Sequence, residues 1–140
     1  IVFAQENNQS AETVCENAVR AAEAALADLE NVNRKRLKEG MPILRFGVGL
    51  HYGEVVYGNV GGTHRLDFTV MGVAVNRTAR LESLTKQIGT PLLMSDVLAS
   101  HITEPTVCCG DFAVKGVAAP LTVHALQSSL PFAKVAEGNP

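Results

Sequence analysis

Residues 65–82 read Arg65-Leu-Asp-Phe-Thr-Val-Met-Gly-Val-Ala-Val-Asn-Arg-Thr-Ala-Arg-Leu-Glu82 and join two patterns of different period. In the first part apolar and polar residues alternate, which predicts a β-strand over 65–71 with one buried face. Gly72 interrupts this pattern. From position 74 the apolar residues recur at helical spacing, which predicts a helix over 74–88. The segment is therefore expected to run from a strand through a glycine turn into an amphipathic helix.

Two polar residues of this predicted helix, Asn76 and Arg80, are four positions apart. Residues at this spacing share one face of a helix. The guanidinium group of arginine is a fixed fork of donors that suits phosphate oxygens, and an asparagine nearby can orient a hydroxyl group. A phosphate-binding site is one interpretation. An ordinary solvated helix face explains the same two residues, and the pattern alone leaves both open.

A long amphipathic helix is predicted over residues 10–38. Ser10 is a suitable N-cap, and Gly40 followed by Pro42 ends the helix. Four basic residues crowd its last turns over 34–38, as the helix dipole favours. A helix lying on a membrane surface is the alternative, but the apolar face is rich in alanine and would anchor weakly.

The other predicted elements are mostly strands, and 127–140 is expected to be a tail or linker. Strands are expected over 44–50, 54–57, 91–95, 106–109, 111–115 and 121–126, with a short helix over 96–102. Gly47 and Gly49 fall inside the first of these strands, which indicates close packing of its backbone against a helix. This order of elements predicts an α+β or α/β fold, in which helices cover a mixed sheet.

The composition excludes several classes of protein. The chain has 140 residues, of which 46% are hydrophobic and 19% charged, so a single folded domain is expected rather than disorder. The net charge of −2 provides no basic field for nucleic acid. No apolar run reaches the roughly 18 residues of a membrane span. Three cysteines without C-x-x-C spacing argue against a zinc site or a disulfide framework and favour a reducing compartment.

From Gly47 through Leu126 the chain resembles the C-terminal two-thirds of a class III nucleotidyl cyclase catalytic domain. The matching stretches are GVGLHYGEVVYGNVG, RLDFTVMGVAVNRTARLE and FAVKGVAAPLTVHAL. The resemblance implies an α+β nucleotide cyclase fold, with a ferredoxin-like or palm-type mixed sheet covered by helices and its N-terminal strands missing from this chain. It also implies a catalytic domain over 1–126 and a C-terminal tail over 127–140.

The resemblance assigns roles to four residues. Arg80 matches the arginine that stabilises the charge developing on the α-phosphate, and Asn76 matches the asparagine that orients the ribose. Thr69 matches the position that helps to read the adenine base, which is aspartate in many relatives and threonine in one subgroup. Lys115 matches a lysine that contacts the terminal phosphates.

The resemblance also implies how subunits pair. Residues 58–66 match a hairpin arm that reaches onto the partner subunit, and within it we assign Asn59, Val60, Gly61 and Arg65 to dimerisation. The expected partner is a second copy of the same chain, and each active site is expected to form across the interface of the homodimer.

Members of the family use two divalent metal ions, here expected to be Mg²⁺ or Mn²⁺. The two aspartates that bind them are expected upstream of residue 1, so we assign no metal ligand within this chain. The fragment alone is accordingly expected to be inactive.

The resemblance predicts an adenylate cyclase that converts ATP to 3′,5′-cyclic AMP and pyrophosphate in intracellular signalling. A cytoplasmic location is expected, as part of a larger membrane-anchored or multidomain protein, without direct membrane contact from this segment. ATP is favoured because Thr69 is not the cysteine that guanylate-forming relatives tend to carry. Two alternatives remain, a guanylate cyclase and a catalytically silent dimerisation or nucleotide-sensing module.

Overall fold

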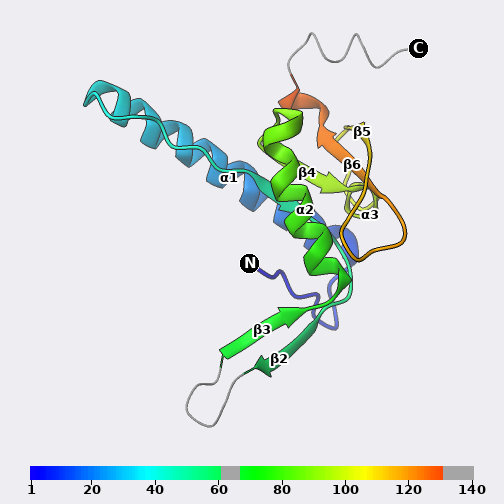
Figure 1. The fold of residues 1–140 in the computed structure, drawn as a ribbon. Coiled ribbons are helices and arrows are strands. Elements are labelled where there is room, and N and C mark those ends of the chain that lie inside the picture. The colour runs from blue at the N-terminus through cyan, green and yellow to red at the C-terminus, as the bar shows by residue number, and fades with distance from the viewer. Residues whose placement is uncertain (61–66, 131–140) are drawn as a thin grey trace.

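The computed structural model describes residues 1–60 and 67–130, and Figure 1 shows their arrangement. Within these residues the helices are α1 (Ala11–Lys38), α2 (Val73–Ile88), α3 (Asp96–Ala99) and the short 3₁₀ helix η1 (Gln127–Ser129). The strands are β1 (Val48–Leu50), β2 (Val56–Val60), β3 (Asp67–Met71), β4 (Leu92–Ser95), β5 (Thr106–Phe112) and β6 (Leu121–Leu126). In the described part of the chain, no helix has the length and apolar character needed to cross a bilayer.

Four strands form the main sheet in the order β1-β4-β6-β5. β1 lies parallel to β4, whereas β4 and β5 both run antiparallel to β6. β2 and β3 form a separate antiparallel ribbon, which projects away from the sheet in Figure 1. The predicted mixed sheet with covering helices is therefore confirmed.

Among the described residues, two core clusters meet at β4, whose four residues are all buried. Leu92 and Met94 pack in the cluster that contains Cys15 and Val19 of α1. Leu93 packs in the cluster that contains residues of α2 and β6. Successive side chains of a strand point to opposite faces, so α1 and α2 cover opposite faces of the sheet.

Glycines in and beside β1 allow α2 to approach its backbone closely, as the sequence predicted. A Cβ atom on Gly49 would lie 2.5 Å from the backbone nitrogen of Glu82 and 2.7 Å from the carbonyl oxygen of Thr78. A Cβ atom on Gly47 would overlap the hydroxyl group of Thr85, which is buried in the contact between helix and strand. The absence of side chains at these two positions therefore sets the distance between α2 and the sheet.

Several predicted boundaries are wrong. The strand expected over 44–50 forms only at Val48–Leu50, because the backbone of Leu44 bonds to the side chain of Asn33 on α1, with both contacts at 2.8 Å. The strands expected over 106–109 and 111–115 form one strand, which contains a bulge between Cys108 and Gly110 and ends at Phe112. The helix expected over 96–102 ends at Ala99.

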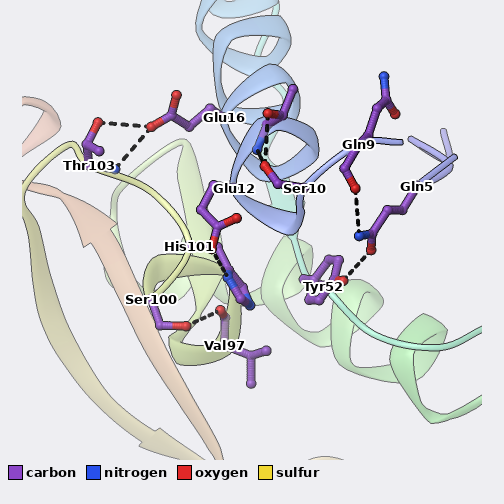
Figure 2. Close-up of polar contacts among 11 residues, drawn as sticks. Gln5, Gln9, Ser10, Glu12, Glu16, Tyr52, Val97, Ser100, His101 and Thr103 are labelled. Atoms are coloured by element: carbon purple, nitrogen blue, oxygen red, sulfur yellow. Dashed lines mark hydrogen bonds and ion pairs between the residues drawn. The ribbon is translucent and has the colours of Figure 1, made fainter. Parts of the chain in front are cut away.

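The start of α1 is fixed to the rest of the molecule by polar contacts, which Figure 2 shows. The hydroxyl group of Ser10 caps the helix by accepting from the Thr13 amide at 3.1 Å, as predicted. Glu16 accepts from the hydroxyl group of Thr103 at 2.9 Å. Glu12 lies 3.5 Å from His101. The pKa of Glu12 is lowered mainly by a backbone hydrogen bond, and the hydrogen bond with His101 is the next largest cause. α1 is thereby attached to the segment that follows α3.

Candidate functional site

Asn76 and Arg80 lie on the side of α2 that faces away from the core. Ala74, Leu81 and Leu84 of the same helix are buried, whereas Asn76 is exposed and Arg80 is partly exposed. The amphipathic character predicted for this helix is thus confirmed. A guanidinium and an amide one turn apart can therefore contact the same ligand from one helix face.

The guanidinium group of Arg80 is anchored at one end. Its Nε donates a hydrogen bond to the carbonyl oxygen of Ala113 at 3.0 Å. Across residues 1–60 and 67–130, no protein acceptor is found for the two terminal nitrogens of Arg80. The side chain therefore has a fixed direction while its fork of donors is still available to an anion, as a phosphate-binding arginine requires.

The same contact connects α2 to the loop that carries Lys115. Lys115 is exposed and lies two residues after Ala113, in the loop that follows the end of β5 at Phe112. Consecutive Cα atoms are about 3.8 Å apart, so the backbone of Lys115 is within roughly 8 Å of the carbonyl group that Arg80 contacts. The structure thus places the backbone of Lys115 near the carbonyl group that Arg80 contacts, although the two residues are 35 positions apart in the chain (80 to 115).

Thr69 lies in β3, opposite Gly58 of β2, and its side chain is half-buried. β3 is followed directly by Gly72 and α2, so Thr69 is joined to the helix of Asn76 and Arg80 by a short connection.

Of the residues assigned to the dimerisation arm, Asn59 and Val60 lie in β2, paired with Phe68 and Asp67. Gly61 and Arg65 lie outside the described residues.

The ribbon of β2 and β3, with the residues next to it, carries a group of exposed apolar side chains. They are Val55, Val56, Tyr57, Met71 and Val73. Exposed apolar residues gathered on one element are typical of a surface that binds another protein.

His51, at the end of β1, has a structural contact with β4. Its Nδ1 lies 2.7 Å from the hydroxyl group of Ser95, which is fully buried and also accepts from the Leu98 amide at 3.3 Å. Burial lowers the pKa of His51 below its ordinary value, the positive charge of Arg77 lowers it further, and Asp96 acts in the opposite direction. Within the described chain, the buried Nε of Arg77 has no hydrogen-bond partner.

Because of this lowered pKa, we expect the protein to lose stability as the pH falls through about 6.5, the ordinary value for histidine. Below this pH the unfolded chain takes up a proton that the folded His51 still excludes. Urea unfolding between pH 7.5 and 5.5 measures the effect, and His51→Asn should reduce the pH dependence. His124→Asn is the control, because His124 also contacts a hydroxyl group, that of Thr106 at 3.1 Å. An unchanged pH dependence in His51→Asn would contradict the expectation.

The residues that the structure describes do not fit a metal site by themselves. Among them, no three histidine, cysteine or acidic side chains are grouped so that they could hold a metal ion.

Two contacts near the site could not be predicted from the sequence. The acceptor for Arg80 is a backbone carbonyl group, which every residue possesses, so Ala113 carries no sequence signal. The pairing of His51 with Ser95 joins residues 44 positions apart, and no local pattern relates them.

A family model and solved structures together identify this chain as a nucleotidyl cyclase domain. Residues 4–128 match the model of the adenylate and guanylate cyclase catalytic domain, and the chain belongs to this family. It is 44% identical over 68 residues to an adenylate cyclase of Anabaena cylindrica, covering 49% of this chain and 14% of the relative. It is 39% identical over 104 residues to adenylate cyclase 1 of Rhizobium meliloti, covering 74% of this chain and 16% of the relative. The chain thus spans only a small part of the length of either relative.

Solved structures show the same fold. A bacterial light-regulated adenylyl cyclase aligns over 93% of this chain and 38% of its own, with a TM-score of 0.73 and 25% identity. The adenylyl cyclase CyaB from P. aeruginosa aligns over 92% of this chain and 68% of its own, with a TM-score of 0.70 and 25% identity. The guanylyl cyclase Cya2 aligns over 86% and 61%, with a TM-score of 0.67 and 29% identity. The resemblance to class III cyclases and the α+β fold are therefore confirmed.

Proposed function

We propose that this domain converts ATP to 3′,5′-cyclic AMP and pyrophosphate. The observation that carries the proposal is the anchored guanidinium group of Arg80, one helical turn after Asn76 and next to the loop of Lys115. A fixed arginine fork beside a second cation suits a triphosphate whose charge changes during the reaction. The two adenylate cyclases among the relatives support ATP as the substrate.

In this reaction the ribose 3′-oxygen forms a bond to the α-phosphorus, and the bond from that phosphorus to the oxygen bridging to the β-phosphate breaks. The hydroxyl proton is released, and pyrophosphate leaves with the electron pair. Catalysis of phosphoryl transfer depends on positioning and on stabilising charge more than on covalent steps. Members of the family typically use divalent metal ions, which would neutralise phosphate charge in this reaction.

Each side chain has one role in the proposal. The terminal nitrogens of Arg80 stabilise the charge that grows on the α-phosphate and the leaving oxygen. The amide of Asn76 holds the ribose so that its 3′-hydroxyl is directed at the phosphorus. Lys115 binds the terminal phosphates, and Thr69 donates or accepts a hydrogen bond at the base.

We further propose that the catalytic domain spans residues 1–126, with 127–140 as a tail, and that it works as a homodimer with shared active sites. The exposed apolar group around β2 and β3 supports this partner, because such a surface gains stability when a second subunit covers it. We place the domain in the cytoplasm, because three cysteines without C-x-x-C spacing favour a reducing compartment. Sedimentation of Tyr57→Asp against the parent tests the dimer, since a buried charge should shift the equilibrium toward monomer.

The choice of nucleotide is tested by measuring ATP and GTP turnover side by side, in the natural polypeptide with any residues that precede Ile1. We expect cyclic AMP to form faster than cyclic GMP. The similarity to a guanylyl cyclase makes GTP the second candidate, and preferential GTP turnover would establish it. Absence of turnover with either nucleotide would support the silent nucleotide-sensing module instead.

A further inference from the structure

The loop that carries Lys115 contains a turn whose backbone favours glycine. The amide of Val117 donates to the carbonyl oxygen of Val114 at 3.1 Å, which closes the turn. Gly116 lies inside it with φ of +78°, in the left-handed region. A Cβ atom at Gly116 would meet nothing within 4 Å, so space does not require glycine here. Only the backbone conformation favours glycine at this position, because other residues are strained at this φ.

The residues before Lys115 attach this turn to α2. Val114 is only 6% exposed and packs in the same cluster as Leu81 and Leu84 of that helix. The carbonyl group of Ala113 accepts the hydrogen bond from Arg80, the neighbour of Leu81. Two consecutive residues, Ala113 and Val114, are thus held by α2, while Lys115 itself is exposed.

We propose that Gly116 is a positioning residue for binding the terminal phosphates. Its left-handed conformation turns the chain back immediately after Lys115, which keeps the lysine beside the anchored guanidinium of Arg80. The ammonium and guanidinium groups then act on one triphosphate. Because Gly116 acts through Lys115, it touches no substrate itself. This inference rests on the proposed function of the site.

The structure offers a closely matched control for testing Gly116. Gly40, after the end of α1, has φ of +71°, and a Cβ atom added there would also meet nothing within 4 Å. Gly116→Ala and Gly40→Ala therefore impose similar backbone strain without a steric clash. Both should lower the melting temperature by a similar amount. Only Gly116→Ala should alter nucleotide binding.

The probes are α,β-methylene ATP and AMP, with binding measured by calorimetry in the natural polypeptide, including any residues that precede Ile1. The methylene analogue keeps all three phosphates but cannot be cleaved at the bond that cyclisation breaks. Gly116→Ala should weaken its binding roughly fivefold to tenfold, the range expected when one charge-assisted contact is impaired. AMP lacks the terminal phosphates, so its affinity should change less than about twofold. In turnover assays the KM for ATP should rise more than kcat falls.

Gly116→Asn provides a rescue test, because asparagine tolerates the left-handed region better than alanine does. It should bind the methylene analogue with an affinity closer to that of the parent. Equal affinities in Gly116→Ala and Gly40→Ala, or a loss in Gly116→Asn as large as in Gly116→Ala, would overturn the positioning role. If the parent protein binds neither the triphosphate analogue nor ATP, the proposed function fails and this inference fails with it. Parent binding with no specific effect of Gly116 refutes the inference alone.

Discussion

Replacing Arg80 with alanine is expected to reduce the rate of cyclic AMP formation about a thousandfold, the effect typical of an arginine that stabilises a phosphoryl-transfer transition state. The guanidinium group is held at one end by the carbonyl oxygen of Ala113, so its terminal nitrogens are directed before the substrate arrives. Alanine removes these donors. The rate is measured with saturating ATP in the natural polypeptide, and kcat should fall far more than KM rises.

Two further variants test this explanation. Arg80→Lys keeps the positive charge but loses the planar fork and the Nε contact, so it should recover only a small part of the rate. Arg34→Ala removes an exposed arginine from the distal part of α1 and should leave the rate unchanged. If Arg80→Ala retained activity within a few-fold of the parent, the role proposed for Arg80 would be wrong.

A second large effect is expected from Gly49→Ala, which should destabilise the fold by at least about 3 kcal/mol. The added Cβ would lie 2.5 Å from the Glu82 nitrogen and 2.7 Å from both the Thr78 oxygen and the Leu81 Cβ. Two of these atoms belong to the backbone of α2 and cannot move by changing a rotamer. The helix must therefore shift away from β1, which opens the core around Leu81 and Leu84. Urea unfolding followed by circular dichroism measures the loss.

Gly58→Ala is the control for this second effect. Gly58 also lies in a strand, but the nearest atom to its Cβ position is the methyl group of Met71, at 4.0 Å. The control should change the free energy of unfolding by no more than about 0.5 kcal/mol. Similar losses in Gly49→Ala and Gly58→Ala would show that the close approach of α2 does not limit stability.

Much of the architecture was predictable because it depends on local patterns. Apolar residues at helical spacing located α1 and α2, and the buried side chains of α2 include Ala74, Leu81 and Leu84, as that spacing required. Glycines in a strand indicated a helix close to the backbone, and Gly47 and Gly49 have that contact. Ser10 was recognised as an N-cap because capping requires only a side-chain oxygen and a neighbouring amide.

The wrong predictions concern segments that are shaped by distant partners. The alternating residues before Val48 are typical of a strand, but Asn33 binds the backbone of Leu44 from another element, and β1 begins only at Val48. The predicted break inside β5 was a bulge that antiparallel pairing with β6 accommodates. A local pattern shows which conformation a segment favours, but it does not show which groups will meet its backbone.

In the candidate site, too, the sequence determines the local placement of residues, whereas the tertiary structure determines which distant groups meet. The order of residues placed Asn76 and Arg80 on one helix face, because helical geometry follows directly from spacing along the chain. Folding in three dimensions placed the carbonyl group of Ala113 against Arg80, 33 positions away in the chain, and brought Lys115 with it. Backbone carbonyl groups are chemically alike at every residue, so the sequence does not identify the acceptor. The packing of Val114 against α2 brings the neighbouring carbonyl group of Ala113 to Arg80.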